Sequence, residues 1–385
     1  MTDHSLHTDA VQSPQIAIIG AGLTGLFTAT LLERAFRQAK DRALVPQITV
    51  FEKSAGVGRL ATRYRSDSYS GKNWQWAFGA QFFTAKTSNF QQFIAPWLES
   101  KLIQPWCAQV VDLNPASVSG QSLDIQQKEQ WDTAQARYIS TPKMTSWGRA
   151  LADELAHTTI NFKTRIAPLA QYPQSQVDNK TELFDETEDS LGYFDWVICT
   201  APNAQALELM VDSGFTEQAK ITEPQMQACY TLMLGWDNVQ PLPETLNNQQ
   251  KPTWDVAYVN DSIIDRIFIE HHKPAHDELL PSVTIHASND WSEQYVDEDI
   301  ETVKAQLLQA AKQALNWNEN SAPSQVECHR WRYAATVTEA DKEVLGILVD
   351  QQQQWIVSGD WCGQGNIESC YQMAQQTVEA VCQTT

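Results

Sequence analysis

Apolar residues follow two spacings along the chain, and both occur near its start. Residues 16–19 form a short, continuous apolar run, which is typical of a buried parallel strand. After a glycine-rich turn, apolar residues recur at helical spacing between Leu26 and Phe36. A second apolar run at residues 48–51 ends at Glu52. Together these segments predict a strand, a helix and a second strand, the repeating unit of parallel sheets.

The remaining patterns predict a mixture of strands and helices. Further strands are predicted at residues 160–163, 194–200, 229–236, 263–270 and 355–358. Helices are predicted at residues 141–155, 298–315 and 366–382. In the first of these, Thr141 is expected to cap the helix and Pro142 to occupy its first turn. Four glutamines at residues 351–354 predict a turn between two strands.

The turn after the first strand carries three glycines at the spacing of a dinucleotide-binding loop. Gly20 suits a tight turn, Gly22 lets the backbone approach a pyrophosphate, and Gly25 allows close packing of helix on strand. The helix N-terminus then favours the phosphates, and Glu52 is placed to accept hydrogen bonds from a ribose. The strand before and the helix after the glycines give this motif the context that an isolated glycine pattern lacks.

Composition narrows the class of protein. The chain has 385 residues, enough for two joined domains. Its formal charge is −20, which disfavours nucleic acid and anionic membranes as partners. No apolar stretch approaches the roughly 20 residues of a membrane span. The seven cysteines form no Cys-x-x-Cys pair and predict a reduced, cytoplasmic protein without a metal site. Residues 1–13 are polar, so we expect a flexible tail and no signal peptide.

Two further blocks distinguish a flavin from a nicotinamide cofactor. Gly58 and Arg59 follow shortly after Glu52, and Gly359 with Asp360 ends the last predicted strand, before the final helix. Both pairs resemble motifs of the amine-oxidase-like flavoproteins, in which they meet the pyrophosphate and ribityl parts of FAD. Only one glycine fingerprint is present among sixteen glycines, so the substrate itself is expected to reduce the cofactor.

The combined blocks resemble those of the renalase-like flavoproteins within that superfamily. The resemblance rests on residues 16–30, 50–63, 79–84, 142–155, 230–234, 329–334 and 359–370. It departs at Val57, where the family usually has glycine, and at Ala77 and Phe78, where an acid often precedes the Gly79 block.

The resemblance implies an α/β FAD-binding Rossmann-like domain and an α+β substrate domain with a mainly antiparallel sheet. Because cofactor motifs lie at both ends of the chain, the FAD domain is expected to be discontinuous. Its expected segments are 14–84, 141–205 and 325–385, and the substrate domain is expected at 85–140 and 206–324.

The resemblance also implies noncovalent FAD and an oxidase that takes a hydride to flavin N5 and passes electrons to O2. Misreduced dihydro-NAD(P) isomers are the implied substrates. An amine oxidase or desaturase acting on another small molecule, and a nonenzymatic FAD-binding protein, stay open as alternatives. The oligomeric state is not indicated.

Site residues follow from the motifs and the resemblance. Cofactor contacts are expected at Gly20, Ala21, Gly22, Leu23, Thr24, Gly25, Glu52, Lys53, Gly58, Arg59, Leu60, Ala80, Gln81, Ile166, Thr200, Ala201, Pro202, Gly359, Asp360, Asn366 and Ile367. Catalytic roles near the flavin are expected for Gln81, Phe82, Arg332 and Trp361. Arg330 and Arg332 alternate with aromatic residues, so one pair should line the pocket and the other the surface. The histidines at 271, 272 and 276 are interpreted as a polar loop.

Overall fold

The computed structural model describes most of the chain. The described residues are 13–38, 45–56, 58–115, 123–172, 180–239, 241–247, 253–338 and 343–383. Apart from residue 13, the predicted N-terminal tail lies outside them, as does Val57.

The first predicted strand lies in the middle of a six-stranded sheet. Its strands are, in spatial order, β10 (Thr158–Phe162), β2 (Gln47–Glu52), β1 (Gln15–Ile19), β13 (Trp196–Cys199), β20 (Trp355–Val357) and β19 (Leu348–Asp350). All neighbours are parallel except β19 and β20, which form a hairpin around the four glutamines. The predicted Rossmann-like sheet is therefore confirmed.

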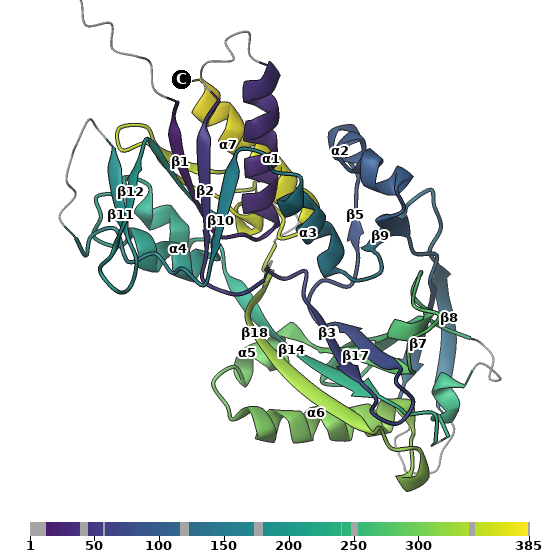
Figure 1. The fold of residues 1–385 in the computed structure, drawn as a ribbon. Helices are drawn as coiled ribbons and strands as arrows, with labels where there is room; N and C mark the ends of the chain where they lie inside the picture. Colours follow the sequence, from purple (N-terminus) through teal and green to yellow (C-terminus); the bar gives the residue numbers. More distant parts are fainter. Residues whose placement is uncertain are drawn as a thin grey trace, which may run out of the picture.

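Helices cover this sheet because its side chains alternate between two apolar faces. Ile16 and Ile18 of β1 pack towards α1 (Leu23–Gln38) and α7 (Ile367–Cys382), which lie side by side in Figure 1. Ala17 packs on the opposite face with α4 (Asn203–Met210) and the hairpin of β11 (Thr181–Phe184) and β12 (Ser190–Phe194). The glycine turn between β1 and α1 is thereby held between two packed layers.

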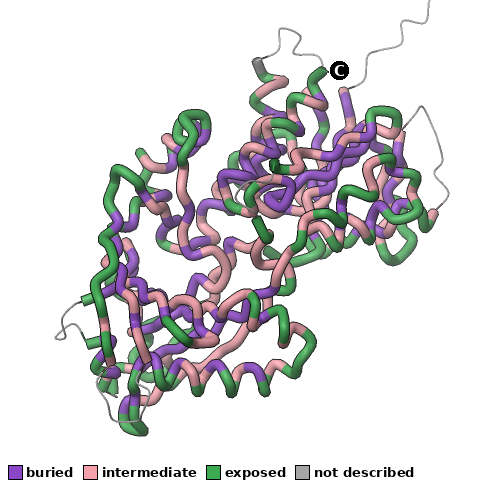
Figure 2. Tube along the Cα trace, turned by 180° about the vertical axis from the view of Figure 1, so that it is seen from behind, coloured by how far each residue is buried: buried purple, intermediate pink, exposed green. Residues whose placement is uncertain are grey.

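A second sheet has seven strands and is mainly antiparallel, as predicted. Its strands are, in spatial order, β18 (Gln325–Thr336), β14 (Met226–Gly235), β17 (Ser282–Ala287), β16 (Ile264–Ile269), β15 (Val256–Val259), β7 (Gln109–Asn114) and β8 (Asp124–Gln130). Only β15 and β7 pair in parallel among them. Helices α5 (Asn289–Gln294) and α6 (Ile300–Leu315) accompany it, and α6 packs on one face. Figure 1 shows the two sheets in separate halves of the molecule, and Figure 2 shows that buried segments run through both.

Short elements join the two sheets. The hairpin of β3 (Thr62–Ser66) and β4 (Asn73–Ala77) reaches the seven-stranded sheet, where Trp74 and Trp76 donate indole N–H groups to the carbonyls of Trp236 and Leu234, both at 2.9 Å. A small sheet of β5 (Phe83–Thr84), β9 (Arg137–Ser140) and β6 (Ile103–Pro105) lies beside α2 (Ser88–Glu99).

One helix starts later than predicted. The helix expected from residue 141 begins instead at Thr145, as α3 (Thr145–Asp153). The reason is that Thr141 donates its hydroxyl to the carbonyl of Lys101 and does not cap the helix.

Strand β18 was assigned by sequence to the cofactor-binding segments, but it hydrogen-bonds along its length to β14 of the seven-stranded sheet. The pairing satisfies the backbone groups on this edge of β14. The division into two domains stays a prediction, since strand pairing alone does not define a domain.

Candidate functional site

The glycine turn presents an open cradle at the carboxyl end of β1. Gly20 has φ +111°, which favours glycine, and a Cβ on Gly25 would lie 2.0 Å from the carbonyl oxygen of Gly20. A Cβ on Gly22 would meet nothing within 4 Å. Thr200 closes the other side, donating its hydroxyl towards the carbonyls of Ile19 and Gly20 at 3.1 Å. Gly22 thus faces open space at a helix N-terminus, where backbone N–H groups favour phosphate.

Glu52 lies where the sequence predicts, at the end of β2. One carboxylate oxygen accepts from the backbone N–H of Ala21 at 2.9 Å and the other from Ser54 at 2.8 Å. The side chain is buried. Its two oxygens retain lone pairs beyond these bonds, as ribose recognition requires. The next residue, Lys53, turns towards α4 and donates to Gln205 at 2.8 Å.

The Gly58–Arg59 segment lies directly over the glycine turn. A Cβ on Gly58 would lie 3.1 Å from the Cα of Gly22, and the φ of Gly58 is +56°. Arg59 forms an ion pair with Asp360 at 2.5 Å and donates to the carbonyl of Ala334 at 3.1 Å. The N-terminal and C-terminal motifs, some 300 residues apart, are therefore in contact. Leu60 turns inward and joins the core.

The C-terminal block forms a second turn before a helix. Gly365 has φ +69° and donates its N–H to the carbonyl of Asp360 at 2.9 Å. Asn366 caps α7 by accepting from the backbone N–H of Ser369 at 2.9 Å, and Ile367 begins the helix. The side-chain oxygen of Thr336, which approaches Gly365, is buried without a hydrogen-bond partner among the described residues. An unpaired polar atom at a helix N-terminus is a position where a ligand group fits.

The remaining predicted cofactor residues come just after the carboxyl ends of other strands in the six-stranded sheet. Thr200, Ala201 and Pro202 connect β13 to α4, and buried Ile166 follows β10. Parallel strands bring all of these segments to one edge of the sheet, the edge at which α/β proteins bind ligands.

Two of the expected catalytic side chains contact other parts of the protein. Trp361 is 1% exposed and donates its indole N–H to the carbonyl of Ala201 at 3.0 Å, so it offers no surface to a substrate. Arg332 pairs with Asp297 at 2.8 Å, whereas Trp331 on the opposite face donates to the carbonyl of Phe78 at 2.8 Å. The strand alternation was predicted, but the inward face carries Trp331 and not Arg332.

Gln81 and Phe82 lie between the two sheets. The Phe82 ring packs on Trp131 with centroids 4.7 Å apart. The Gln81 side chain is buried and accepts from Lys273 Nζ at 2.8 Å. These contacts bury the Gln81 side chain, whereas neighbouring Ala80 and Phe82 keep partly exposed surface.

A buried polar network around Gln81 was not predicted. Lys273 also pairs with Glu270 at 2.9 Å, and Glu270 accepts from Thr284 at 2.6 Å. Burial lowers the pKa of Lys273 even though Glu270 opposes that shift. His276 is buried as well, with Nδ1 2.7 Å from the carbonyl of Glu270. The interpretation of this histidine segment as a polar loop therefore needs correction at its last histidine, which is part of the interior, whereas His271 and His272 are partly exposed.

Comparisons with known proteins agree with this architecture. Residues 18–97 match a family model described as an NAD(P)-binding Rossmann-like domain. A protein from Exiguobacterium sp. 255-15, provisionally named protoporphyrinogen oxidase, is 14% identical with a TM-score of 0.69, over 97% of this chain and 100% of that chain. A putrescine oxidase solved with putrescine is 11% identical, with a TM-score of 0.66, over 97% and 99% of the two chains. A cyclohexylamine oxidase from Brevibacterium oxydans IH-35A is 11% identical, with a TM-score of 0.65 and the same coverage. The chain shares the fold of these proteins.

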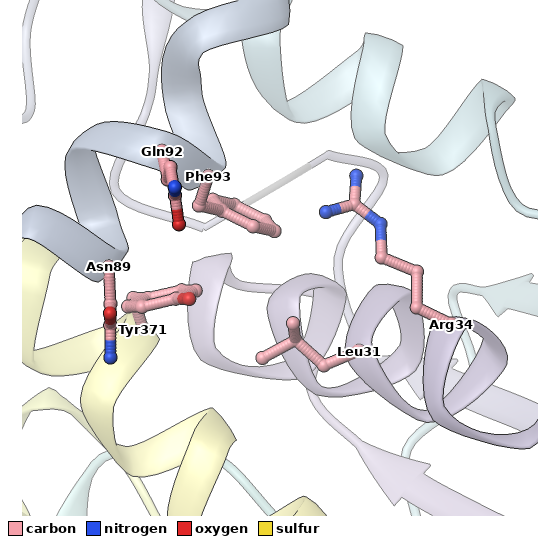
Figure 3. Close-up of a pocket in the computed structure, with 6 residues that line it drawn as sticks. All are labelled: Leu31, Arg34, Asn89, Gln92, Phe93 and Tyr371. Atoms are coloured by element: carbon pink, nitrogen blue, oxygen red, sulfur yellow. The ribbon is translucent and has the colours of Figure 1, made fainter. Parts of the chain in front are cut away.

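A separate groove of about 460 Å³ lies among α1, α2 and α7. Figure 3 shows the residues that line it, which are Leu31, Arg34, Asn89, Gln92, Phe93 and Tyr371. The Arg34 guanidinium lies 5.0 Å from the centroid of the Phe93 ring. None of these residues belongs to the predicted cofactor or catalytic set.

The described ranges contain no cluster of three or more His, Cys, Asp or Glu side chains that could hold a metal ion. No helix within them is long and apolar enough to cross a membrane. All seven cysteines are free, and burial raises the pKa of the Cys362 thiol well above its ordinary value.

Proposed function

We propose that this chain is an FAD-dependent oxidoreductase that takes a hydride from a small-molecule donor and passes the electrons to O2. The observation that carries the proposal is the cradle around Gly22, which faces open space while Gly58 packs over it and the Arg59–Asp360 ion pair joins both ends of the chain there. The fold shared with oxidases supports the same class of reaction.

The residues fit FAD along its length. The amides at the start of α1 would hold the pyrophosphate, Glu52 the adenosine ribose, and Arg59 with Asp360 the linker. The N-terminus of α7 and the unpaired Thr336 hydroxyl would meet the flavin end. Noncovalent binding is supported by Cys362, whose buried thiol has a raised pKa and stays protonated.

Bound FAD would supply the hydride acceptor, and the protein would supply orientation and electrostatics. Ala80 and Phe82, both partly exposed between the two sheets, are the proposed contacts of the reacting ring. A dihydropyridine donor needs no strong general base, because it already carries a transferable hydride. On the basis of the renalase-like motifs, we propose dihydro-NAD(P) isomers as the substrates. We also propose that the protein acts in the cytoplasm.

Amine oxidation is the second candidate, and the similarity to putrescine oxidase and cyclohexylamine oxidase favours it. The two candidate functions differ in the kind of substrate that the same site would bind. A protonated amine is recognised by hydrogen-bond acceptors and carboxylates, whereas a dihydronicotinamide presents an amide and carries phosphates elsewhere.

Anaerobic titration of the FAD-loaded protein separates these functions. Borohydride-reduced NAD, a mixture of the 2-, 4- and 6-dihydro isomers, should bleach the flavin absorbance, while putrescine and cyclohexylamine should leave it unchanged. Rapid bleaching by an amine alone would replace the proposal with amine oxidation. Bleaching by dithionite alone would indicate a nonenzymatic FAD-binding protein.

A further inference from the structure

The seven-stranded sheet places two polar side chains next to each other on its inner face. Pairing sets Arg266 of β16 opposite His286 of β17, and Tyr258 of β15 opposite Arg266. Their strand neighbours Ile267 and Ile285 lie on the other face, in the core under α6. Because side chains alternate along a strand, His286, Arg266 and Tyr258 form one row on the face that carries the Gln81 network.

The contacts of Gln81 determine which way its amide points. Lys273 Nζ can only donate, so the atom 2.8 Å from it must be the amide oxygen of Gln81. The amide nitrogen then donates to the carbonyl of Ala77. If the amide were reversed, its nitrogen would face Lys273 Nζ, a donor against a donor, and its oxygen would face the carbonyl oxygen of Ala77, an acceptor against an acceptor. Both contacts therefore fix the orientation of the amide.

This orientation sets the tautomer of His286. The Gln81 amide nitrogen lies 3.3 Å from His286 Nε2 and 3.4 Å from the carbonyl oxygen of Gly79. It has only hydrogens to offer, so in its contact with His286 the Nε2 atom is the acceptor. The ring is then neutral, with its proton on Nδ1. The same state follows from electrostatics, since burial, followed by the charges of Arg266 and Lys273, lowers the pKa of His286 to about 3. Among the described residues, Nδ1 has no hydrogen-bond partner, so it presents an unused donor.

Arg266 adds further unused donors beside it. Its Nε donates to Asp265 at 2.6 Å, and its guanidinium carbon lies 5.3 Å from the centroid of the Tyr258 ring. Within the described parts of the chain, neither terminal nitrogen has a hydrogen-bond partner, and the side chain is 35% exposed. Arg266 and His286 therefore both present donors on this face of the sheet, with the Asp265 carboxylate held on Arg266 Nε, and such donors suit a ligand oxygen.

We propose that His286 Nδ1 and the Arg266 guanidinium together bind the carboxamide oxygen of the substrate. In this proposal Gln81, held by Lys273 and Glu270, is a positioning residue that keeps His286 in the donating tautomer. The assignment rests on the proposed function and narrows it to planar donors that carry an amide oxygen. It also relocates the substrate-binding arginine from Arg332 to Arg266.

Substitution of the two donors tests the proposal on the FAD-loaded protein, by calorimetric titration with nicotinamide. His286→Leu should weaken nicotinamide binding about fivefold and Arg266→Gln about tenfold, as expected for a lost neutral and a lost charged hydrogen bond. His286→Asn keeps a donor near the Nδ1 position and should recover most of the affinity. Pyridine, which lacks the carboxamide, should bind all variants alike.

Controls distinguish recognition from folding. Arg332→Gln removes an arginine from the opposite face of the same sheet and should leave nicotinamide affinity unchanged. Lys273→Met should weaken binding of nicotinamide but not of pyridine, because the amide of Gln81 is then free to reverse. Thermal unfolding of every variant identifies any that fail to fold, and His286→Asn provides the test if His286→Leu is one of them.

The outcomes separate this proposal from the proposed function. Equal nicotinamide affinity in wild type, His286→Leu and Arg266→Gln would overturn the donor pair, even if dihydronicotinamides reduce the flavin. An effect of Arg266→Gln on reduced NAD but not on nicotinamide would assign the arginine to phosphate and also overturn it. Nicotinamide affinity that depends on His286, with no reduction by any dihydronicotinamide, would support the donor pair and contradict the function.

Discussion

Gly22 and Gly25 serve different purposes within one turn. A side chain at Gly25 would collide with the backbone of Gly20, whereas a side chain at Gly22 would enter the open space of the cradle. On the proposed function, Gly22 serves ligand binding and Gly25 serves the fold. This contrast allows binding and stability to be tested separately with two matched alanine substitutions.

Gly22→Ala should weaken FAD binding at least tenfold, because the methyl group occupies the space of the pyrophosphate. Its unfolding free energy without FAD should be unchanged or raised by up to about 1 kcal/mol. Gly25→Ala should lower that free energy by about 1–3 kcal/mol through overpacking. Denaturant unfolding of the apoprotein and titration with FAD measure both effects. Equal loss of stability in the two variants would mean that Gly22 is structural.

Some residues of the candidate site follow from local sequence patterns and others do not, for a physical reason. Gly20, Glu52 and Asp360 follow strand ends, so local pattern and parallel pairing place them together. Lys273 and His286 meet Gln81 only through packing of segments about 200 residues apart. The one local signal was a polar side chain within an apolar strand, as at Arg266 and His286. Alternation predicted two faces for β18 but could not say which face is inward.

At the scale of elements, Glu33 ties α1 to the connection between α3 and β10. Its carboxylate accepts from the backbone N–H groups of Ala156 and His157 and from the hydroxyl of Thr158. Burial alone would raise the pKa of Glu33, but these hydrogen bonds outweigh it and the pKa is lowered. The charged form is therefore the one that stabilises the fold, and it holds the edge strand β10 beside the helix layer.

Glu33→Gln should lower the unfolding free energy by about 1.5–3 kcal/mol at neutral pH, the range for hydrogen bonds to a charged group. Because the folded pKa is below the unfolded one, this contribution is complete above the ordinary glutamate pKa. It disappears as the pH falls through the folded value. Denaturant unfolding of both proteins across the acid range checks this. A difference that stays constant with pH would show that the charge of Glu33 is not the cause.

The presence of helices and strands was predicted more accurately than the residues at which they begin and end. The strands of the six-stranded sheet and the helices α6 and α7 follow apolar spacing closely, because a regular buried face leaves a regular pattern. The start of α3 was misplaced because Thr141 bonds to Lys101, a contact that no local rule contains. The partner of β18 could not be predicted either, since side-chain alternation along a strand separates its two faces but does not specify the edge to which it pairs.

At the scale of the whole molecule, a chain of charge −20 would have to hold the proposed anionic cofactor by local features. The N-termini of α1 and α7 and the side chain of Arg59, all at the carboxyl edge of the six-stranded sheet, are the features proposed to do so. The seven-stranded sheet contributes the Gln81 network and the row of His286 and Arg266. The proposed site therefore draws on both sheets and on both ends of the chain.

The central claim is that this assembled edge binds FAD. The most direct measurement is the visible spectrum of the purified protein, followed by identification and quantification of the cofactor released by heat. The account predicts a yellow protein that releases one FAD per chain. A colourless protein that takes up no FAD when it is supplied would contradict it.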